Sequence, residues 1–308
     1  MNNGKNFTVH ILGWDSAMPT QGNISSSQVI KYGKKLFMVD CAEGAQNKMI
    51  DRKLGYQNID TIFISHLHGD HMFGLIAILC VMNLGGRTKK LRIVSPHGLQ
   101  ALYQPMLDMF CTDMRYEYEF IEVDDTVETI VYEDSFLTVI AFPLHHSIPC
   151  VGYLFKEKVG LPHINIDKIN KDRIPCSYIG QIKKGIDFDI ENGCHIHCAD
   201  YFLPPSPIRS YAYCSDTSYF EGLADYVRGC DFLYHEASFK EEDRAHAEKF
   251  GHSTAMDAAK TAKDAEVKHL IIGHISERYG DKYEVLEEAR SVFAHTILAS
   301  DLNIINIY

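Results

Sequence analysis

The sequence predicts an α/β protein in which two sheets are stacked between helices. Strand and helix patterns alternate in the first and last thirds of the chain, and the middle third alternates polar and apolar residues like paired strands. No repeat of a solenoid period breaks this order. We therefore expect one domain over residues 1–308, interrupted by an irregular excursion at 156–193 that is rich in proline and glycine turn signals.

In the first third, short apolar runs alternate with helical patterns. The run at 61–65 is continuously apolar apart from its ends, which is typical of a strand buried on both faces. The pattern that follows it is helical and stops at Gly85-Gly86. The expected strands are 7–12, 29–32, 35–39, 61–65 and 91–94, and the expected helices are 44–54, 72–84 and 96–110.

The middle is β-rich and the last third returns to β/α alternation. Residues 116–123 and 126–142 alternate like paired strands with a turn near Glu133-Asp134. Further strands are expected at 150–155, 211–214, 231–234 and 269–273, and helices at 223–228, 241–250, 254–263 and 283–293.

Composition excludes several classes of protein. Hydrophobic residues make up 46% of the chain, too many for a disordered protein, and the longest apolar run, 73–84, is too short and too interrupted to span a membrane. The net charge of −11 excludes nucleic-acid binding through average charge, so such binding needs a local basic patch. The polar N-terminus and nine scattered cysteines suggest reduced thiols in the cytoplasm.

Four potential metal ligands follow the strand expected at 61–65: His66, His68, Asp70 and His71. Ligands of open α/β sheets favour the carboxyl ends of strands. Because residues two apart in an extended segment point the same way, His66 and His68 are expected to share one metal. Asp70 and His71 stand where the chain turns into a helix and can face a second metal. A polar loop that happens to be rich in histidine is the less favoured alternative.

The His-x-His-x-Asp-His pattern resembles the signature of the metallo-β-lactamase superfamily. Six further blocks occur in an order that resembles ribonuclease Z, the endonuclease that removes 3′ trailers from precursor tRNA; they are 40–44, 143–146, 214–217, 235–239, 251–254 and 273–276. The resemblance implies an α/β, metallo-β-lactamase-like αββα four-layer sandwich of two mixed sheets with a protruding arm. It implies zinc-dependent cleavage that leaves a 3′-hydroxyl on the tRNA and a 5′-phosphate on the trailer.

The resemblance also implies a ligand set. The first metal would take His66, His68, His146 and Asp216, and the second would take Asp70, His71, Asp216 and His274. Taken alone, Asp216 would be read as a helix cap, and the two distant histidines as core or loop residues. Side-chain alternation means that only one of His145 and His146 faces the site, and the family pattern favours His146. Two Zn²⁺ per subunit are expected, with Mn²⁺ also compatible with mixed nitrogen and oxygen ligands.

Asp70 and His252 are the expected catalytic residues. Asp70 would act as general base on the nucleophilic water. His252 precedes a helix that begins at Ser253-Thr254, where an imidazole can steady a phosphate and protonate the leaving oxygen. Asp40, His235 and Glu236 are expected to orient these residues rather than to react.

The excursion at 156–193 matches the tRNA-binding arm of the family. From Lys156 to Lys184 there are seven basic and three acidic residues, a local positive charge on an acidic protein. The candidate tRNA-binding residues are Lys168, Lys171, Arg173, Lys183 and Lys184. The resemblance implies precursor tRNA as partner and a homodimer in which the arm of one subunit holds tRNA for the site of the other.

Other interpretations stay open. A metallo-β-lactamase-fold hydrolase of a small phosphodiester or thioester would keep the metal site, a non-catalytic RNA-binding protein would lack a ligand, and a diiron oxygen reductase would need a flavin domain. Residues 194–198, Cys-His-Ile-His-Cys, could be taken for a separate zinc site. Because adjacent residues of a strand face opposite ways, an edge strand is the favoured interpretation.

Overall fold

The computed structural model describes residues 5–160, 163–190, 193, 195–204, 207–302 and 304–308. Among these, the chain divides into two compact units. The large unit comprises Lys5–Glu157 and Arg209–Tyr308, and the small unit comprises Lys158–Ile208. The sequence predicted an excursion over 156–193, and the small unit extends to 208.

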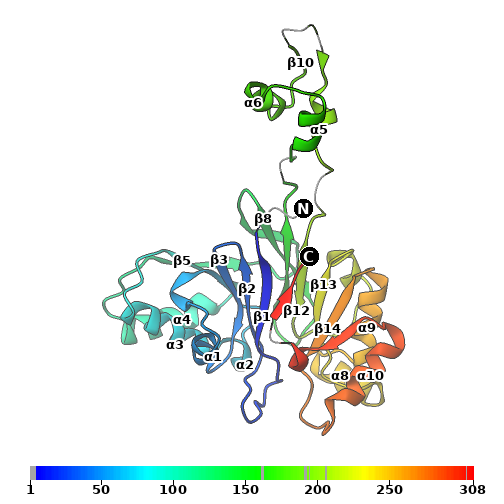
Figure 1. Ribbon diagram of the computed structural model, residues 1–308. Helices are drawn as coiled ribbons and strands as arrows, with labels where there is room; N and C mark the ends of the chain where they lie inside the picture. The colour runs from blue at the N-terminus through cyan, green and yellow to red at the C-terminus, as the bar shows by residue number, and fades with distance from the viewer. Residues whose placement is uncertain (1–4, 161–162, 191–192, 194, 205–206, 303) are drawn as a thin grey trace. The chain divides into compact units, whose positions relative to one another are not determined.

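The large unit contains two seven-stranded mixed sheets (Figure 1). In the first sheet the strand order is β16-β1-β2-β3-β4-β5-β6, antiparallel from β16 to β3 and parallel from β3 to β6. Its strands are β1 (Phe7–Gly13), β2 (Ser27–Tyr32), β3 (Lys35–Cys41), β4 (Ile59–Phe63), β5 (Leu91–Pro96), β6 (Tyr118–Val123) and β16 (Ile304–Asn306).

The second sheet repeats this design. Its order is β15-β14-β13-β12-β9-β8-β7, with antiparallel pairs from β7 to β12 and parallel pairs from β12 to β15. The strands are β7 (Thr129–Glu133), β8 (Leu137–Leu144), β9 (Cys150–Glu157), β12 (Ser210–Cys214), β13 (Phe232–Glu236), β14 (His269–Gly273) and β15 (Thr296–Leu298).

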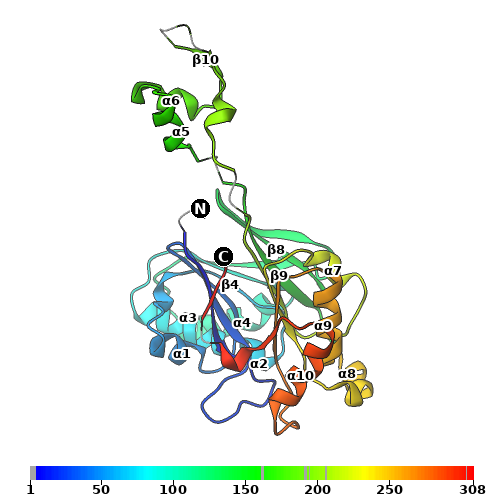
Figure 2. The same cartoon turned by 45° about the vertical axis from the view of Figure 1, so that its right-hand side comes forward.

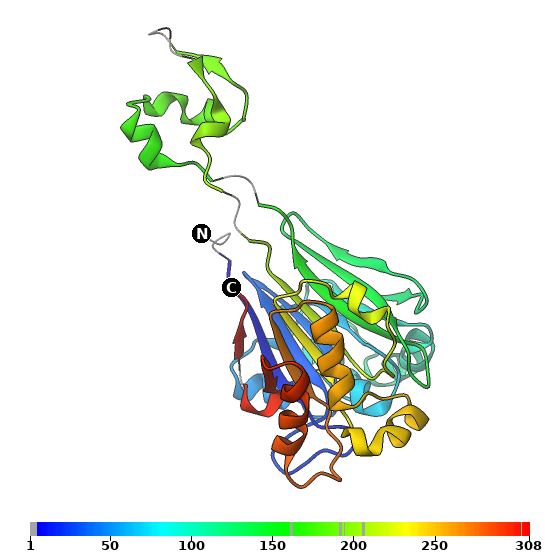
Figure 3. The same ribbon diagram turned by 90° about the vertical axis from the view of Figure 1, so that its right-hand side faces the viewer.

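Helices cover the outer face of each sheet, which gives the expected αββα layers (Figures 1 and 2). The first sheet carries α1 (Ala45–Asp51), α2 (Gly69–Met72), α3 (Gly74–Leu84) and α4 (Leu99–Phe110). The second carries α7 (Leu223–Tyr226), α8 (Arg244–Phe250), α9 (Ala255–Asp264) and α10 (Lys282–Val292). Figure 3 shows α9 and α10, in orange and red-orange, along the outer face of the second sheet.

Three apolar clusters hold these layers together. One lies between the sheets and contains many aromatic side chains, including Phe37, Phe63 and Tyr153. The other two lie between each sheet and its helices, and the cluster on the second sheet includes Ala255, Ala258, Ala259 and Ala262 from α9. The N-terminus of α9 is fixed by a capping box, in which Thr254 Oγ1 accepts from the Asp257 amide and the Asp257 carboxylate accepts from the Thr254 amide.

The structure corrects three details of the sequence analysis. The helix expected at 72–84 is α3, which begins at Gly74, and a separate short helix, α2, precedes it at Gly69–Met72. Residues 118–123 do not pair with the following strands, because β6 joins β5 in the first sheet while β7 and β8 pair in the second. The strands β15 and β16 were not predicted, since three residues are too few to show an alternation.

The small unit has its own apolar cluster of Ile169, Ile174, Ile182, Ile196, Cys198 and Tyr201. It contains α5 (Ile166–Lys171), α6 (Ile179–Ile182) and an antiparallel ribbon of β10 (Phe188–Asp189) and β11 (His195–Ile196). All five candidate tRNA-binding residues lie on or directly after α5 and α6. Among the described residues of both units, no helix is both long enough and apolar enough to cross a membrane.

Candidate metal centre

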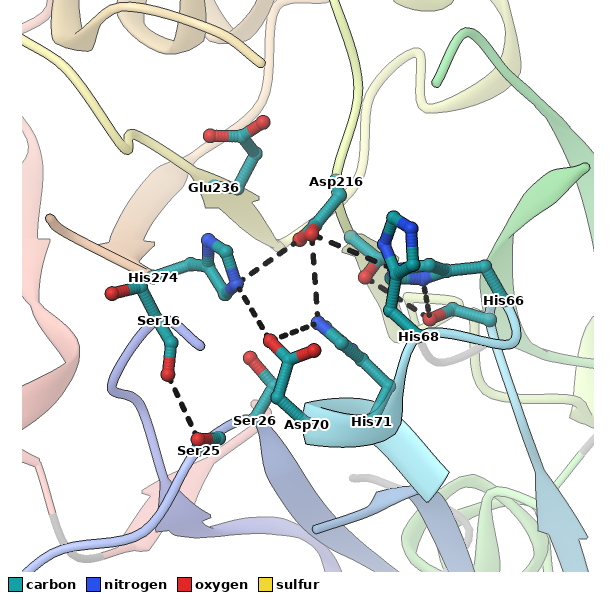
Figure 4. Close-up of polar contacts among 12 residues, drawn as sticks. Ser16, Ser25, Ser26, His66, His68, Asp70, His71, Asp216, Glu236 and His274 are labelled. Atoms are coloured by element: carbon teal, nitrogen blue, oxygen red, sulfur yellow. Dashed lines mark hydrogen bonds and ion pairs between the residues drawn. The ribbon is translucent and has the colours of Figure 1, made fainter. Parts of the chain in front are cut away.

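The seven side chains predicted as metal ligands come from four loops, and each loop follows a strand. The segment after β4 contributes His66 and His68 from its loop and Asp70 and His71 from α2, and the loops after β8, β12 and β14 contribute His146, Asp216 and His274. The structure brings all seven together at one edge of the two sheets. In Figure 4 the polar atoms of His68, Asp70, His71, Asp216 and His274 turn toward a common centre. They form two adjacent groups, and within each group the potential ligand atoms lie within 4.8 Å of one another.

The first group consists of His66, His68, His146 and Asp216. His68 Nδ1 lies 3.1 Å from His66 Nε2 and 3.2 Å from His146 Nε2. Asp216 Oδ2 lies 3.6 Å from His66 Nε2 and 3.9 Å from His146 Nε2. Ligands placed tetrahedrally around one Zn²⁺ would be about 3.3–3.6 Å apart, so this arrangement fits an ion with little adjustment.

The imidazoles of this first group favour the neutral form that binds metals. Burial lowers the pKa of His66 well below its ordinary value, and it also lowers the pKa of His68 and His146. A neutral imidazole offers a lone pair to a cation, whereas a protonated one does not.

The second group consists of Asp70, His71 and His274. Asp70 Oδ2 lies 3.3 Å from His71 Nε2 and 3.5 Å from His274 Nε2. The two oxygens of Asp216 reach the same imidazoles, at 3.5 Å from His71 Nε2 and 3.4 Å from His274 Nε2. The Asp216 carboxylate therefore lies between the two groups, where a bridging ligand belongs.

Unpaired buried atoms show that these donors fit a cation. His71 Nε2, His274 Nε2 and Asp216 Oδ1 are buried and have no hydrogen-bond partner among the described residues. Leaving a buried polar atom unpaired costs about 1–3 kcal/mol, and three such atoms meet here. A divalent cation at their centre would satisfy all three at once.

Asp40 anchors His71 from behind. Its carboxylate accepts hydrogen bonds from His71 Nδ1 at 2.7 Å, from the Tyr213 hydroxyl at 2.7 Å, and from the backbone and hydroxyl of Ser65 at 2.8 and 2.9 Å. Its backbone is left-handed, with φ of 54°, a conformation that aspartate tolerates better than most residues. The bond to Nδ1 turns Nε2 of His71 toward the centre.

Similar bonds orient His146 and His274. His146 Nδ1 donates to the carbonyl oxygen of Gly251 at 2.7 Å, and His274 Nδ1 lies 2.9 Å from Ser238 Oγ. Gly251 ends α8 with φ of 74°, and a Cβ at this position would come within 2.9 Å of His146 Nδ1. Glycine thus serves both the helix end and the close approach of the imidazole.

The buried Glu236 and the partly exposed His252 form a pair beside the second group. Glu236 Oε1 accepts from His252 Nδ1 at 2.9 Å and from the Ser253 amide at 3.1 Å, while Oε2 accepts from the Ser238 amide at 2.9 Å. Burial alone would lower the pKa of His252, but the Glu236 carboxylate outweighs it and raises the pKa to about 9. The raised pKa favours the protonated form of His252, which can donate a proton.

The structure separates some residues that the sequence grouped. It brings Glu236 but not His235 to His252, because consecutive residues of β13 face opposite sides of the sheet. The His235 ring instead bonds to the backbone oxygen of Glu236 at 2.6 Å. The ring of His145 stacks on Phe220 with centroids 3.9 Å apart, while its neighbour His146 enters the first group.

Sequence reasoning missed several residues around the centre. The hydroxyl of Ser65 and the side chain of Ser238 hold ligands, yet a serine beside a motif gives no distinctive signal. A cavity of about 540 Å³ opens onto the ligands, and Lys249 and Phe250 from the end of α8 contribute to its wall. Their nearness to the block at 251–254 is the only signal that could have indicated them.

Comparison with known proteins identifies the relatives of this chain. A family model described as "Anti-Pycsar protein Apyc1" matches residues 7–159, just under half of the chain. Ribonuclease Z of Bacteroides thetaiotaomicron is 42% identical over 295 residues, covering 96% of this chain and 93% of the relative. Ribonuclease Z of Porphyromonas gingivalis is 44% identical, with coverage of 96% and 97%.

The fold has a close counterpart among solved structures. The crystal structure of the short form of human tRNase Z superposes with a TM-score of 0.72 at 24% identity, covering 98% of this chain and 99% of that one. This likeness confirms the metallo-β-lactamase-like arrangement of two sheets and flanking helices. Given identities above 40% along nearly the whole chain, the protein belongs to the ribonuclease Z family.

Proposed function

We propose that the protein is a metal-dependent endoribonuclease that removes the 3′ trailer from precursor tRNA, leaving a 3′-hydroxyl on the tRNA and a 5′-phosphate on the trailer. The observation that carries this proposal is the convergence of five imidazoles and two carboxylates from four loops, in a chain of the ribonuclease Z family. We propose two Zn²⁺ as the resident ions, with His66, His68 and His146 on one, Asp70, His71 and His274 on the other, and Asp216 on both.

Divalent ions held by these residues would lower the pKa of a bound water and offset negative charge on the phosphate oxygens. The protein's own groups move the protons. Burial would raise the pKa of Asp70, but His274 and His71 hold it well below its ordinary range. Asp70 is thus an ionised acceptor facing the centre, placed to take a hydrogen bond from the attacking water and to act as general base.

His252 is the proposed general acid. Its Nδ1 is occupied by Glu236, and the side chain is 16% exposed on the wall of the cavity. A protonated imidazole held in this way can pass a proton to the leaving oxygen of the tRNA while Glu236 keeps the ring in place. Asp40 has the corresponding positioning role for His71.

The basic residues of the small unit are proposed to bind the tRNA backbone. Lys168, Lys171 and Arg173 lie at the end of α5 and just after it, and Lys183 and Lys184 follow α6. Phosphate binding by such residues weakens steeply with salt. Replacing Lys183 and Lys184 by alanine should raise KM for precursor tRNA and flatten its salt dependence, while replacing Lys89 and Lys90 on the large unit should not.

We further propose a cytoplasmic homodimer. The eight cysteines among the described residues are all free thiols, as in a reducing compartment. Large apolar side chains at the end of α4, Met109 and Phe110, are 72% and 61% exposed, and such groups on a surface helix suit a contact between subunits. Light scattering of the protein should give twice the mass of one chain, and a monomer that cleaves fully would contradict the dimer.

The function is tested by incubating the protein with a 3′-extended precursor tRNA and mapping the cut. The expected result is one cut at the boundary of the trailer, abolished by a chelator and restored by Zn²⁺ or Mn²⁺. Hydrolysis of a chromogenic phosphodiester without cleavage of precursor tRNA would favour the alternative, a metallo-β-lactamase-fold hydrolase of small phosphodiesters.

A further inference from the structure

A separate group of metal-binding side chains lies in the small unit, on the ribbon formed by β10 and β11. Asp187, His195 and His197 each offer a ligand atom, and these atoms lie within 4.8 Å of one another. All three side chains are exposed. None of them belongs to the groups proposed for catalysis.

The register of the ribbon explains why these residues meet. Asp189 pairs with His195 and Phe188 pairs with Ile196, so the same antiparallel register sets Asp187 opposite His197. Because side chains alternate along a strand, the two aspartates and the two histidines share one face. The opposite face carries Ile196, which is buried in the apolar cluster of the small unit.

The hydrogen bonds agree with this arrangement. His195 Nδ1 lies 2.7 Å from Asp189 Oδ1, and His197 Nδ1 lies 3.0 Å from Asp187 Oδ2. The two imidazoles meet edge to face, with centroids 4.6 Å apart. Asp187 is fixed further, because its Oδ1 accepts from the backbone amide of Cys198 at 2.8 Å. The sequence analysis favoured a plain edge strand at 194–198, because the carboxylates that face His195 and His197 lie on the other side of the ribbon and outside that segment.

Two imidazoles and one carboxylate are a donor set that Zn²⁺ binds in proteins, with water free to take a fourth position. Ligand atoms around one Zn²⁺ lie about 3.3 Å apart, so the side chains must close by about 1.5 Å at most. Exposed side chains can make such a movement by small rotations. Asp189 contacts Nδ1 of His195, and a carboxylate in this position usually orients a histidine ligand.

The small unit has few contacts to stabilise it, so a bound ion would add to its stability. Its apolar cluster has six buried members, and its ribbon pairs only two residues on each side. An isolated two-stranded ribbon is marginally stable in water, and small folds often add a metal to compensate. Residues 186–208 contain four acidic residues and no lysine or arginine, so the local charge of this segment is negative and favours a cation.

We propose that the β10–β11 ribbon binds one Zn²⁺ through Asp187, His195 and His197, with Asp189 as a positioning residue, and that this ion stabilises the small unit. The site is independent of the proposed nuclease activity. The competing view is that the ribbon contains two cross-strand His–Asp pairs that hold no ion.

Metal content distinguishes the two views. The full-length protein is stripped with a chelator, reloaded with Zn²⁺, desalted and measured by plasma mass spectrometry. The double variant H195N/H197N should hold one Zn²⁺ fewer per chain than the wild type, while H163N, which removes another exposed histidine of the same unit, should hold the wild-type amount. Equal zinc in the wild type and the double variant would overturn the proposal.

A second measurement needs no ligand variant and so does not depend on one folding. Zn²⁺ added to the stripped wild-type protein should slow amide hydrogen exchange across 186–198, and the same addition to H163N should do likewise. Unchanged exchange across this segment would contradict the stabilising role. In a chelator competition, Asp189→Asn should keep the site but weaken its affinity for Zn²⁺ about 10–100-fold, and an unchanged affinity would remove Asp189 from it.

Discussion

The same two residue types, histidine and aspartate, form one cluster in the large unit and another in the small unit, in opposite environments. In the large unit the ligands are mostly buried and their outer nitrogens are bound by Asp40, Gly251 and Ser238, so the inner atoms face one centre in advance. On the ribbon, strand register and hydrogen bonds between exposed side chains bring the group together. Burial thus fixes the geometry of the first cluster in advance, whereas the exposed cluster has fewer contacts to hold it and would gain further order from the proposed ion.

The largest effect is expected from Asp216→Asn, which removes the charge common to both buried groups. We expect the zinc content of the large unit to fall and cleavage of precursor tRNA to drop below detection, because the ions would lose their shared ligand. Metal analysis and a cleavage assay check this. The ribbon variant H195N/H197N should instead retain hydrolysis of a small phosphodiester. Loss of that hydrolysis in both Asp216→Asn and H195N/H197N would contradict the claim that only the buried cluster is catalytic.

Asp70→Asn should reduce the rate of the chemical step about 10²–10⁴-fold, the usual contribution of a general base. The amide keeps the size of the side chain but accepts protons poorly. Single-turnover cleavage with saturating enzyme measures the step directly. A variant that binds normal amounts of zinc and still cleaves at the wild-type rate would assign the base to another residue.

A buried ion pair and an exposed ion pair should also contribute differently to the stability of the protein. Arg209 and Glu157 form a buried pair at 2.7 Å, with side chains 4% and 3% exposed, whereas Lys90 and Glu119 pair at the same distance with side chains 48% and 45% exposed. Glu157→Gln should lower the free energy of unfolding by about 3–5 kcal/mol, because it leaves a buried guanidinium uncompensated. Glu119→Gln should lower it by less than about 1 kcal/mol. Similar losses in urea denaturation would contradict this ranking.

The pH dependence of the buried pair follows from its pKa. Burial alone would raise the pKa of Glu157, but Arg209 and Tyr32 lower it below the ordinary value. A depressed pKa stabilises the fold above the unfolded pKa of about 4.3, and this contribution disappears as the pH falls through the folded pKa. The difference in stability between the wild type and Glu157→Gln should therefore narrow below about pH 4.

Glu236→Gln is expected to have a smaller effect that depends on pH. Without the carboxylate, the pKa of His252 should fall from about 9 toward its ordinary value of about 6.5, so the proposed acid loses its proton at lower pH. The alkaline limit of kcat should move to lower pH, with a loss of about 10–100-fold at pH 8. His252→Asn should abolish the fall of kcat at alkaline pH. An unchanged pH profile in Glu236→Gln would argue against proton donation by His252.

The sequence predicted the fold class and most elements because the core strands are apolar and the helices between them carry clear turn signals. The ligand loop at 66–71 was recognisable because four ligands lie within six residues after a buried strand. His146, Asp216 and His274 required the family resemblance, since a single polar residue after a strand has many uses. The anchors Ser65 and Ser238, and the aspartates that face His195 and His197, depend on contacts between distant segments that no local pattern specifies.

The most direct test of the central claim is cleavage of one 3′-extended precursor tRNA by metal-stripped protein with Zn²⁺ added stepwise. The proposed centre predicts no cleavage without metal, then a single cut at the trailer boundary that leaves a 3′-hydroxyl on the tRNA, with no cleavage by Asp216→Asn at any zinc concentration. Cleavage by the stripped protein, or by Asp216→Asn at the wild-type rate, would contradict it.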